Sequence, residues 1–319
     1  MDSLGDLLKR IPSQEMWQRV ERKKAELIAN PLIVKLRAKY PDITEQVLQQ
    51  NMNRLYQYVT EYNNCSQCPG LDQCPNDMQG HYTKISCDTV NGLTQVYDSK
   101  VSCKKFLGQQ RQDQVRERIR SFYVDDRALK EGYSADEILV KDLERASAAN
   151  QVLTYILRTK EEGLQTNGLY LVGKFGTGKT FLMCYLLYEL AKEGFTGAIV
   201  YMPEFVEDLK SMMLDGAKLK ETMEVLKETD ILIFDDVGAE NMNPWARDHV
   251  LGSILNYRMN RKPTFYTSNY ELDALEKHFS FTSKDGEEAY KGQRLMDRIR
   301  PFVDVIVVNG ENKRGRKKN

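Results

Sequence analysis

The sequence lacks any long apolar run, and no stretch approaches the roughly 18 apolar residues that a membrane-spanning helix needs. Residues 1–17 also lack the apolar core and the small-residue cleavage site of a secretory signal. Net charge is absent too, because 46 Lys and Arg residues balance 46 Asp and Glu residues. We therefore expect a cytoplasmic protein with no membrane partner, in which any contact with nucleic acid comes from local basic patches.

Cysteine is scarce outside one stretch, since five of the six cysteines lie between residues 65 and 103. Disulfides are rare in the cytosol, so clustered cysteines indicate metal or redox chemistry there. The Cys65-x-x-Cys68 spacing is typical of zinc, whereas a redox pair is less favoured because no βαβ pattern surrounds it. Zinc would also give cohesion to a turn-rich stretch with few large apolar residues. Further candidate ligands follow: Cys74, His81, Cys87 and Cys103.

The uneven distribution of cysteine indicates two domains. Residues 1–62 carry apolar side chains at helical spacing, and the following turn-rich segment contains Asn91-Gly92, which is typical of a hairpin turn. A polar segment with little apolar periodicity then separates the two halves. The expected parts are a mainly helical, zinc-binding N-terminal domain (1–104), a partly helical linker (105–135) and a C-terminal domain (136–319).

The C-terminal domain shows the alternation of an α/β fold. After a helix expected near residues 135–157, short β-rich runs alternate with helical segments, which predicts a five-stranded parallel sheet covered by helices on both faces. Few residues follow the last run, so we expect no C-terminal helical lid. The five runs are 168–173, 197–202, 231–236, 263–269 and 303–309.

A phosphate-binding loop follows the first of these strands. The segment from Gly173 to Thr180 reads GKFGTGKT, matches G-x-x-x-x-G-K-[ST] and opens a helix. Its glycines let backbone N–H groups surround the phosphates of ATP, while Lys179 reaches the β/γ oxygens and the Thr180 hydroxyl binds Mg²⁺. The expected ATP-binding residues are Gly173, Gly176, Thr177, Gly178, Lys179, Thr180 and Phe181.

Two later strands end in polar side chains. Asp235 is placed to hold Mg²⁺ and bound nucleotide, and Asp236 to orient and deprotonate an attacking water. The alternative is a strand end capped by turn-forming aspartates. Asn269, after the fourth strand, could contact the γ-phosphate or the water, although a turn or a helix cap explains it equally well.

Three arginines precede the last strand: Arg294, Arg298 and Arg300. The first two are four residues apart and so share one face of a helix. An arginine delivered to the γ-phosphate of a neighbouring subunit accelerates hydrolysis by orders of magnitude. The alternative is a charged helix face in contact with solvent.

The segments GKFGTGKT, ILIFDDVGAE, TFYTSN and QRLMDRIRP resemble those of bacterial replicative-helicase loaders, the DnaI/DnaC group of AAA+ ATPases. The resemblance implies ATP hydrolysis stimulated by assembly or by single-stranded DNA. It assigns catalytic roles to Lys179, Asp236 and Asn269, and makes Arg298 a finger that acts in trans. Arg314 is the nearest match to a second sensor arginine that would bind the nucleotide.

The same resemblance implies partners and a ligand set. The N-terminal domain would dock onto the hexameric replicative DNA helicase, and the ATPase domain would self-associate and contact single-stranded DNA and other primosome proteins. Zinc would be held by Cys65, Cys68, His81 and Cys103, with Cys74 or Cys87 able to replace His81.

Two other functions share parts of this pattern. A helper ATPase for another DNA-transaction client, such as a transposase, has the same core but does not account for the cysteine-bearing domain. A metabolic P-loop kinase would need an acceptor-binding lid, of which the sequence gives no sign. Candidate residues for DNA lie on one lysine-rich helical insert that lacks the aromatics of typical single-strand binders: Lys210, Lys218, Lys220 and Lys227.

Overall fold

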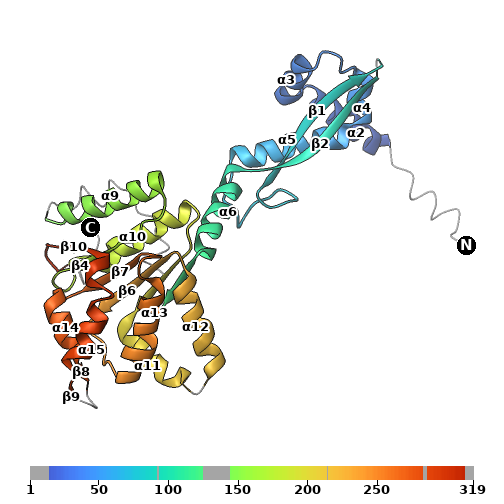
Figure 1. Cartoon of the computed structure of the whole chain (residues 1–319). Coiled ribbons are helices and arrows are strands. Elements are labelled where there is room, and N and C mark those ends of the chain that lie inside the picture. Colours follow the sequence, from blue (N-terminus) through green and yellow to red (C-terminus); the bar gives the residue numbers. More distant parts are fainter. Residues whose placement is uncertain (1–13, 92, 125–143, 214, 283–285, 313–319) are drawn as a thin grey trace, which may run out of the picture. The chain divides into compact units, whose positions relative to one another are not determined.

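The structure is a computed structural model that describes residues 14–91, 93–124, 144–213, 215–282 and 286–312 (Figure 1). The chain divides into two compact units, Met1–Gln112 and Asp113–Asn319. None of the described helices combines the length and the apolar character needed to cross a lipid bilayer.

Four helices begin the first unit, and their ends follow from local sequence. The Asn30 side chain accepts a hydrogen bond from the backbone N–H of Leu32 and Pro31 occupies the first turn, so a new helix starts there. Thr44 caps the next helix in the same way. The expected helical character is confirmed from residue 14 onward, whereas residues 1–13 lie outside the described part. The helices are α2 (Gln14–Ile28), α3 (Pro31–Lys39), α4 (Glu45–Gln50) and α5 (Met52–Ser66).

A long hairpin completes this unit. Strands β1 (His81–Val90) and β2 (Leu93–Ser102) pair antiparallel up to Val90 and Leu93, so the chain reverses between these two residues, as expected for a hairpin; Gly92 itself lies outside the described residues. Asn91 takes a left-handed conformation with φ of 52°. One hydrophobic core joins the helices to the hairpin, with Leu48 and Leu55 among its fully buried members. Helix α6 (Lys104–Glu117) follows, and the division between the two units falls within it.

The second unit is built on a parallel sheet of six strands in the order β10-β4-β7-β6-β5-β3. The five strands expected from the sequence are all present, but the expected count was one too low. The sixth, at one edge, comes from the segment assigned to the linker. The strands are β3 (Ile119–Phe122), β4 (Gly168–Val172), β5 (Gly197–Tyr201), β6 (Ile231–Val237), β7 (Thr264–Ser268) and β10 (Val303–Val307).

Helices cover both faces of this sheet, as Figure 1 shows. Alternate side chains of a strand enter different cores: Leu232 and Phe234 pack with α11 to α15, whereas Ile231 and Ile233 pack with α9 and α10. Helix α9 (Ala146–Glu162) corresponds to the helix expected near residues 135–157, of which 135–143 lie outside the described part. The other helices are α10 (Lys179–Lys192), α11 (Met202–Met212), α12 (Gly216–Glu228), the π-helix η1 (Ala246–Leu251), α13 (Gly252–Arg258), α14 (Leu272–Ser280) and α15 (Ala289–Met296).

Two small elements complete the unit. Strands β8 (Phe281–Thr282) and β9 (Gly286–Glu287) pair antiparallel between α14 and α15, and the short 3-10 turn η2 (Arg300–Phe302) leads into β10. The described residues after β10, numbers 308–312, form no helix.

Candidate active site

The strand order brings the polar strand ends together. Strand β7 lies between β4, which leads into the phosphate-binding loop, and β6, which carries Asp235 and Asp236. Asn269 follows β7 directly. Because the carboxyl ends of parallel strands meet at one edge, the loop, the carboxylates and Asn269 share one site.

The loop has the conformation that a phosphate cradle needs. Gly176 and Gly178 have φ of 77° and 94°, values that other residues rarely adopt. A side chain at Gly173 would also be blocked, because its Cβ would lie 2.3 Å from the carbonyl oxygen of Val308. The buried Thr177 hydroxyl donates to the Lys174 carbonyl over 3.0 Å and braces the loop. Helix α10 then starts with its N–H groups facing the loop.

Lys179 joins the loop to the tip of β7. Its ammonium group donates to the carbonyl oxygens of Gly173 and Lys174, at 2.8 and 2.9 Å, and to Oδ1 of Asn269 at 2.8 Å. The side chain is buried, so its charge acts in surroundings of low dielectric constant. A phosphate group entering the loop would meet this charge.

Asp235 sits at the base of the site. Its carboxylate accepts hydrogen bonds from the Thr180 hydroxyl, at 2.8 and 3.1 Å, and from the Thr267 hydroxyl at 2.6 Å. Burial raises the pKa of Asp235, and the nearby charge of Asp236 adds to this, while the Thr267 and Thr180 hydrogen bonds oppose it. A hydroxyl and a carboxylate are hard oxygen donors that suit Mg²⁺. The pair therefore fits the expected magnesium ligands.

Asp236 stands one residue further along in an unusual conformation. Its φ is 57°, a left-handed value that costs energy for a residue other than glycine. Two hydrogen bonds fix it there: its N–H donates to the Thr267 hydroxyl, and its carboxylate accepts from Nδ2 of Asn269, both over 2.9 Å. The carboxylate is thus aimed by its neighbours.

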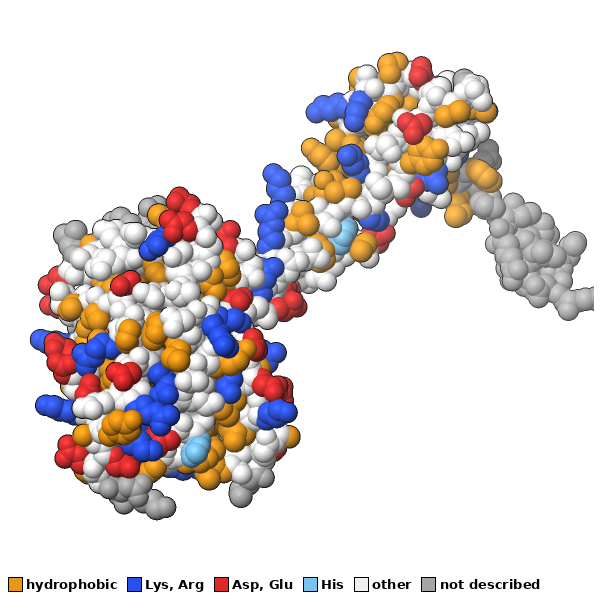
Figure 2. All heavy atoms as spheres, viewed as in Figure 1, with side chains coloured by type: hydrophobic (Ala, Val, Ile, Leu, Met, Phe, Trp, Pro, Cys, Tyr) orange, Lys and Arg blue, Asp and Glu red, His pale blue; other side chains and the backbone are white. Residues whose placement is uncertain are grey.

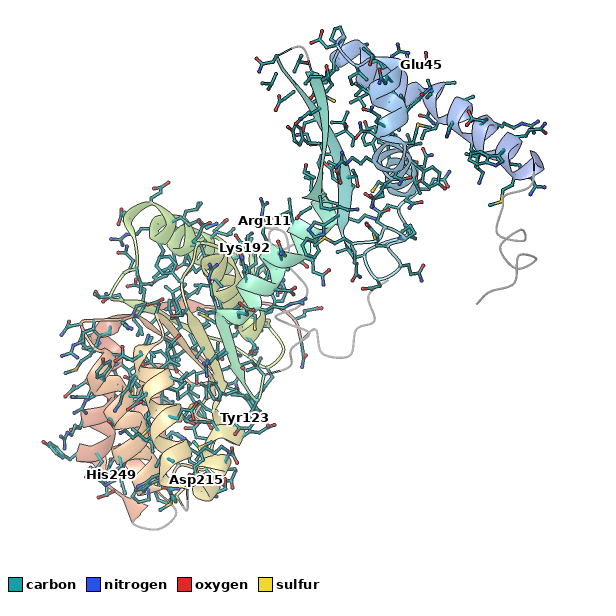
Figure 3. The ribbon with its side chains drawn as sticks, turned by 90° about the vertical axis from the view of Figure 1, so that its right-hand side faces the viewer. Glu45, Arg111, Tyr123, Lys192, Asp215 and His249 are labelled. Carbon is teal, nitrogen blue, oxygen red and sulfur yellow. The ribbon has the colours of Figure 1, made fainter. Side chains whose placement is uncertain are left out.

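These groups line a pocket of about 500 Å³ that also has an apolar wall. Phe181 is one of its lining residues, and so are Tyr123 and Val124, which the sequence reasoning missed. They follow β3, and because that strand was not recognised from the sequence, nothing indicated that they line this pocket. Tyr123, labelled in Figure 3, has φ of 65°, and its hydroxyl donates to Asp208 on α11. Burial and this carboxylate raise the pKa of Tyr123 to about 12.

The arginines before β10 do not line this pocket. Arg298 lines a separate hollow of about 410 Å³, where Nη1 donates to the Arg294 carbonyl over 2.7 Å and Nε lies 3.4 Å from Oδ1 of Asn256. On the face of this unit in Figure 2, Lys and Arg side chains gather where α13 and α15 lie. Arg300 instead pairs with Asp273 and Glu276 on α14. Arg314 lies outside the described residues.

The cysteines of the first unit fall into two groups. Cys87 is buried in the core between helices and hairpin, away from the expected metal site, and burial raises its pKa. Partial burial raises the pKa of Cys65, the hydrogen bond from Asn76 opposes this, and Cys68, Cys74 and Cys103 each raise the pKa further by their charge.

His81 is engaged within the protein. Its Nδ1 lies 2.9 Å from the Gln79 carbonyl oxygen, and its Nε2 lies 3.0 Å from the Ser102 hydroxyl. Neither ring nitrogen is thus presented to a metal. Within the described residues, no group of three or more His, Cys, Asp or Glu side chains is arranged to hold a metal ion. The expected zinc set does not fit the geometry as it stands.

Two protein-family models match one part of the chain each, and one known protein matches nearly the whole chain. Residues 1–91 match the family model of the primosomal protein DnaI N-terminus, and residues 92–319 match that of IstB-like ATP binding proteins. The replicative helicase loader DnaI of Bacillus subtilis (strain 168) is 32% identical over 320 residues, which cover 98% of this chain and 99% of that protein.

Two further matches are confined to part of the chain. A crystal structure of DnaI superposes with a TM-score of 0.51 and 31% identity, covering 64% of this chain and 100% of that chain. An ATP-binding protein of insertion sequence IS1162 from Pseudomonas fluorescens is 28% identical over 127 residues, 40% of this chain and 54% of that protein. Because DnaI aligns along nearly the whole chain, this chain belongs to the DnaI family of replicative helicase loaders, with an IstB-like ATP-binding domain.

Proposed function

We propose that this chain binds a hexameric replicative DNA helicase and deposits it on single-stranded DNA in the cytoplasm, during primosome assembly, under the control of ATP hydrolysis. The observation that carries the ATPase part is the meeting of Lys179, Asp235, Asp236 and Asn269 at one edge of the sheet. The helicase as client comes from the DnaI relative, which aligns with both units.

Each polar group has a separate task in hydrolysis. The loop N–H groups and Lys179 bind the phosphates, and Thr180 and Asp235 would hold Mg²⁺, which neutralises charge on the phosphate oxygens. Asp236 orients the attacking water and accepts its proton. Asn269 is hydrogen-bonded to both Lys179 and Asp236 and so fixes the position of the ammonium group relative to the carboxylate.

Arg298 serves a neighbouring copy of the chain. Its hollow is separate from the nucleotide pocket of its own subunit, and this supports an action in trans. In that arrangement the site is complete only where two copies meet, so hydrolysis reports assembly.

Zinc binding by the first unit is a separate proposal. Cys68, Cys74 and Cys103 each act electrostatically on the Cys65 thiol, and four cysteine thiols are a donor set that zinc accepts. With His81 turned to Gln79 and Ser102, Cys74 is the better fourth ligand. Zinc release from the full chain, measured for Cys74→Ser and for His81→Asn, tests this: the first should lose the metal and the second should keep it. Absence of zinc from the unaltered chain would refute the site.

A circular single strand provides the test of loading, because a closed helicase ring cannot thread onto it from an end. We expect the full chain with ATP to increase displacement of an annealed strand by the helicase, and Lys179→Ala to abolish this increase. No increase with the unaltered chain, combined with binding to an insertion-sequence transposase, would favour the alternative role as a transposase helper, which the partial IS1162 match suggests.

A further inference from the structure

Arg145 is a buried cation beside the phosphate-binding loop that no step described above uses. It directly precedes α9, and its side chain is 8% exposed. A Cβ placed on Gly178 would lie only 2.3 Å from Nη1 of Arg145. The guanidinium carbon lies 5.4 Å from the centroid of the Phe181 ring. The charge therefore rests against the end of the loop where α10 begins.

The groups of the loop and of α10 that lie beside this charge are themselves positive. The N-terminus of α10 carries positive partial charge, and Lys179 adds a full positive charge one residue from Gly178. In the described part of the chain, Nε of Arg145 has no hydrogen-bond partner, and no ion pair there involves Arg145. A buried donor and charge left in this state cost free energy unless a ligand satisfies them.

We propose that Arg145 is a second cation of the nucleotide site and binds a phosphate oxygen that ATP and ADP share. This inference rests on the proposed ATPase site. The contact with Gly178 and Phe181 places Arg145 at the start of α10, where the loop N–H groups bind the α- and β-phosphates. Lys179 and Asn269 serve the opposite end, toward the γ-phosphate. Arg145 thus holds nucleotide before and after hydrolysis.

The variant Arg145→Met separates this role from a structural one. Methionine keeps an unbranched stem against Phe181 but removes the charge and the donors. The control is Arg158→Met within α9, because Arg158 is exposed and pairs at the surface with Glu162, over 2.8 Å. Each variant is titrated with Mg-ATP and with Mg-ADP, and its Tm is measured without nucleotide.

We expect Arg145→Met to weaken ATP and ADP binding by the same factor, about ten- to hundredfold, the value of a charge-assisted hydrogen bond. Its Tm without nucleotide should be unchanged or higher, because a repulsive charge is gone. Arg158→Met should change neither quantity. Arg145→Lys, which keeps the charge but loses the planar fork, should fall between and serves if the methionine variant does not fold.

Three results would overturn the inference: both dissociation constants within twofold of the unaltered chain, a loss confined to ATP, or a fall in Tm without nucleotide. The unaltered chain and Lys179→Ala report on the proposed function independently. If the unaltered chain binds neither nucleotide, the proposed ATPase site fails and this inference fails with it. If it binds both and Arg145→Met binds them equally well, only the role of Arg145 is wrong.

Discussion

The side-chain amide of Asn269 donates a 2.9 Å hydrogen bond to the carboxylate of Asp236. Its orientation is fixed from the other side, because Oδ1 accepts from Lys179, whose ammonium group can only donate. One uncharged side chain at the tip of β7 thus links the cation expected at the γ-phosphate to the carboxylate expected at the attacking water.

Removing this link should slow hydrolysis without preventing binding. We expect Asn269→Ala to lower kcat by about 10²- to 10³-fold, the usual cost of losing one positioned donor. The dissociation constant for ATP should change less than about threefold, since the loop N–H groups remain. Steady-state phosphate release and ATP titration measure the two effects. Asn150→Ala, at an exposed position of α9, is the control, and an equal loss in both variants would contradict the assignment.

Asp235 should show a trade-off between function and stability. Its pKa is raised by burial, so the folded state holds its proton to higher pH than the unfolded state does. The stability that this proton contributes is full below about pH 4, the ordinary value for Asp, and is lost as pH rises through the raised pKa. The variant Asp235→Asn does not lose stability in this way, because an amide does not ionise.

We therefore expect Asp235→Asn to have a higher Tm than the unaltered chain at pH 7 in the absence of nucleotide. The difference should grow with pH from about pH 4 and then level off above the raised pKa. Magnesium-dependent ATP turnover should fall by at least about 100-fold, because an amide is a poor ligand for Mg²⁺. A Tm difference that stays constant from pH 4 to pH 8 would contradict the raised pKa.

Arg258 stabilises the fold, although it belongs to none of the sequence motifs. The side chain is 1% exposed, and burial lowers its pKa to about 10. It donates to Oγ1 of Thr264 at 3.0 Å and, at 2.6 Å each, to the backbone carbonyls of Thr229, at the end of α12, and of Pro263, just before β7. It therefore ties α13 to the turn that enters β6.

We expect Arg258→Met to reduce the free energy of unfolding by about 2–4 kcal/mol, because several buried carbonyl groups lose their donor together. Arg261→Met is the matched control: Arg261 is exposed and contacts the Tyr257 ring, so its loss should cost less than about 0.5 kcal/mol. Urea unfolding of the two variants measures both values. Equal effects would show that the hydrogen bonds of Arg258 contribute little.

The action of Arg298 in trans can be tested by mixing two inactive variants. Arg298→Ala lacks the finger, and Asp236→Asn lacks the water-orienting carboxylate, although asparagine tolerates the left-handed backbone at that position. When they are mixed in equal amounts, about a quarter of the subunit contacts should join an intact finger to an intact site. ATP turnover should recover to that level. No recovery at any protein concentration would place Arg298 in its own site.

That the candidate site residues would meet at one edge of the sheet was predictable from sequence, because they lie at the ends of apolar strands. Apolar content identifies three strands from the sequence, and Lys179, Asp235 and Asn269 lie at or after their carboxyl ends. Because the strands of a parallel sheet all run in one direction, these ends lie at the same edge of the sheet. The hydrogen bond from Thr267 to Asp235 could not be predicted in this way, since it depends on the register of β6 against β7.

Strand β3 and two buried arginines could not be predicted from the sequence. Strand β3 has only four residues, includes Arg120 and sits at the sheet edge, so it lacks the apolar run that marks a central strand. Arg145 and Arg258 read as ordinary surface arginines, because burial of a charged side chain depends on contacts made by distant segments. The spacing of apolar residues along the sequence shows which face of a helix or strand is buried, but it does not show contacts between distant segments.

Strand β3 also determines where the chain can be truncated without damage to the nucleotide pocket. It continues from α6, which crosses the division between the two units, and Tyr123 and Val124 follow it directly into the nucleotide pocket. A fragment that starts after residue 122 would therefore expose the edge of β5 and leave Tyr123 and Val124 without the strand that positions them. Limited proteolysis within residues 119–124 should release an ATPase domain with weakened nucleotide binding, whereas a cut before α6 should leave the site whole.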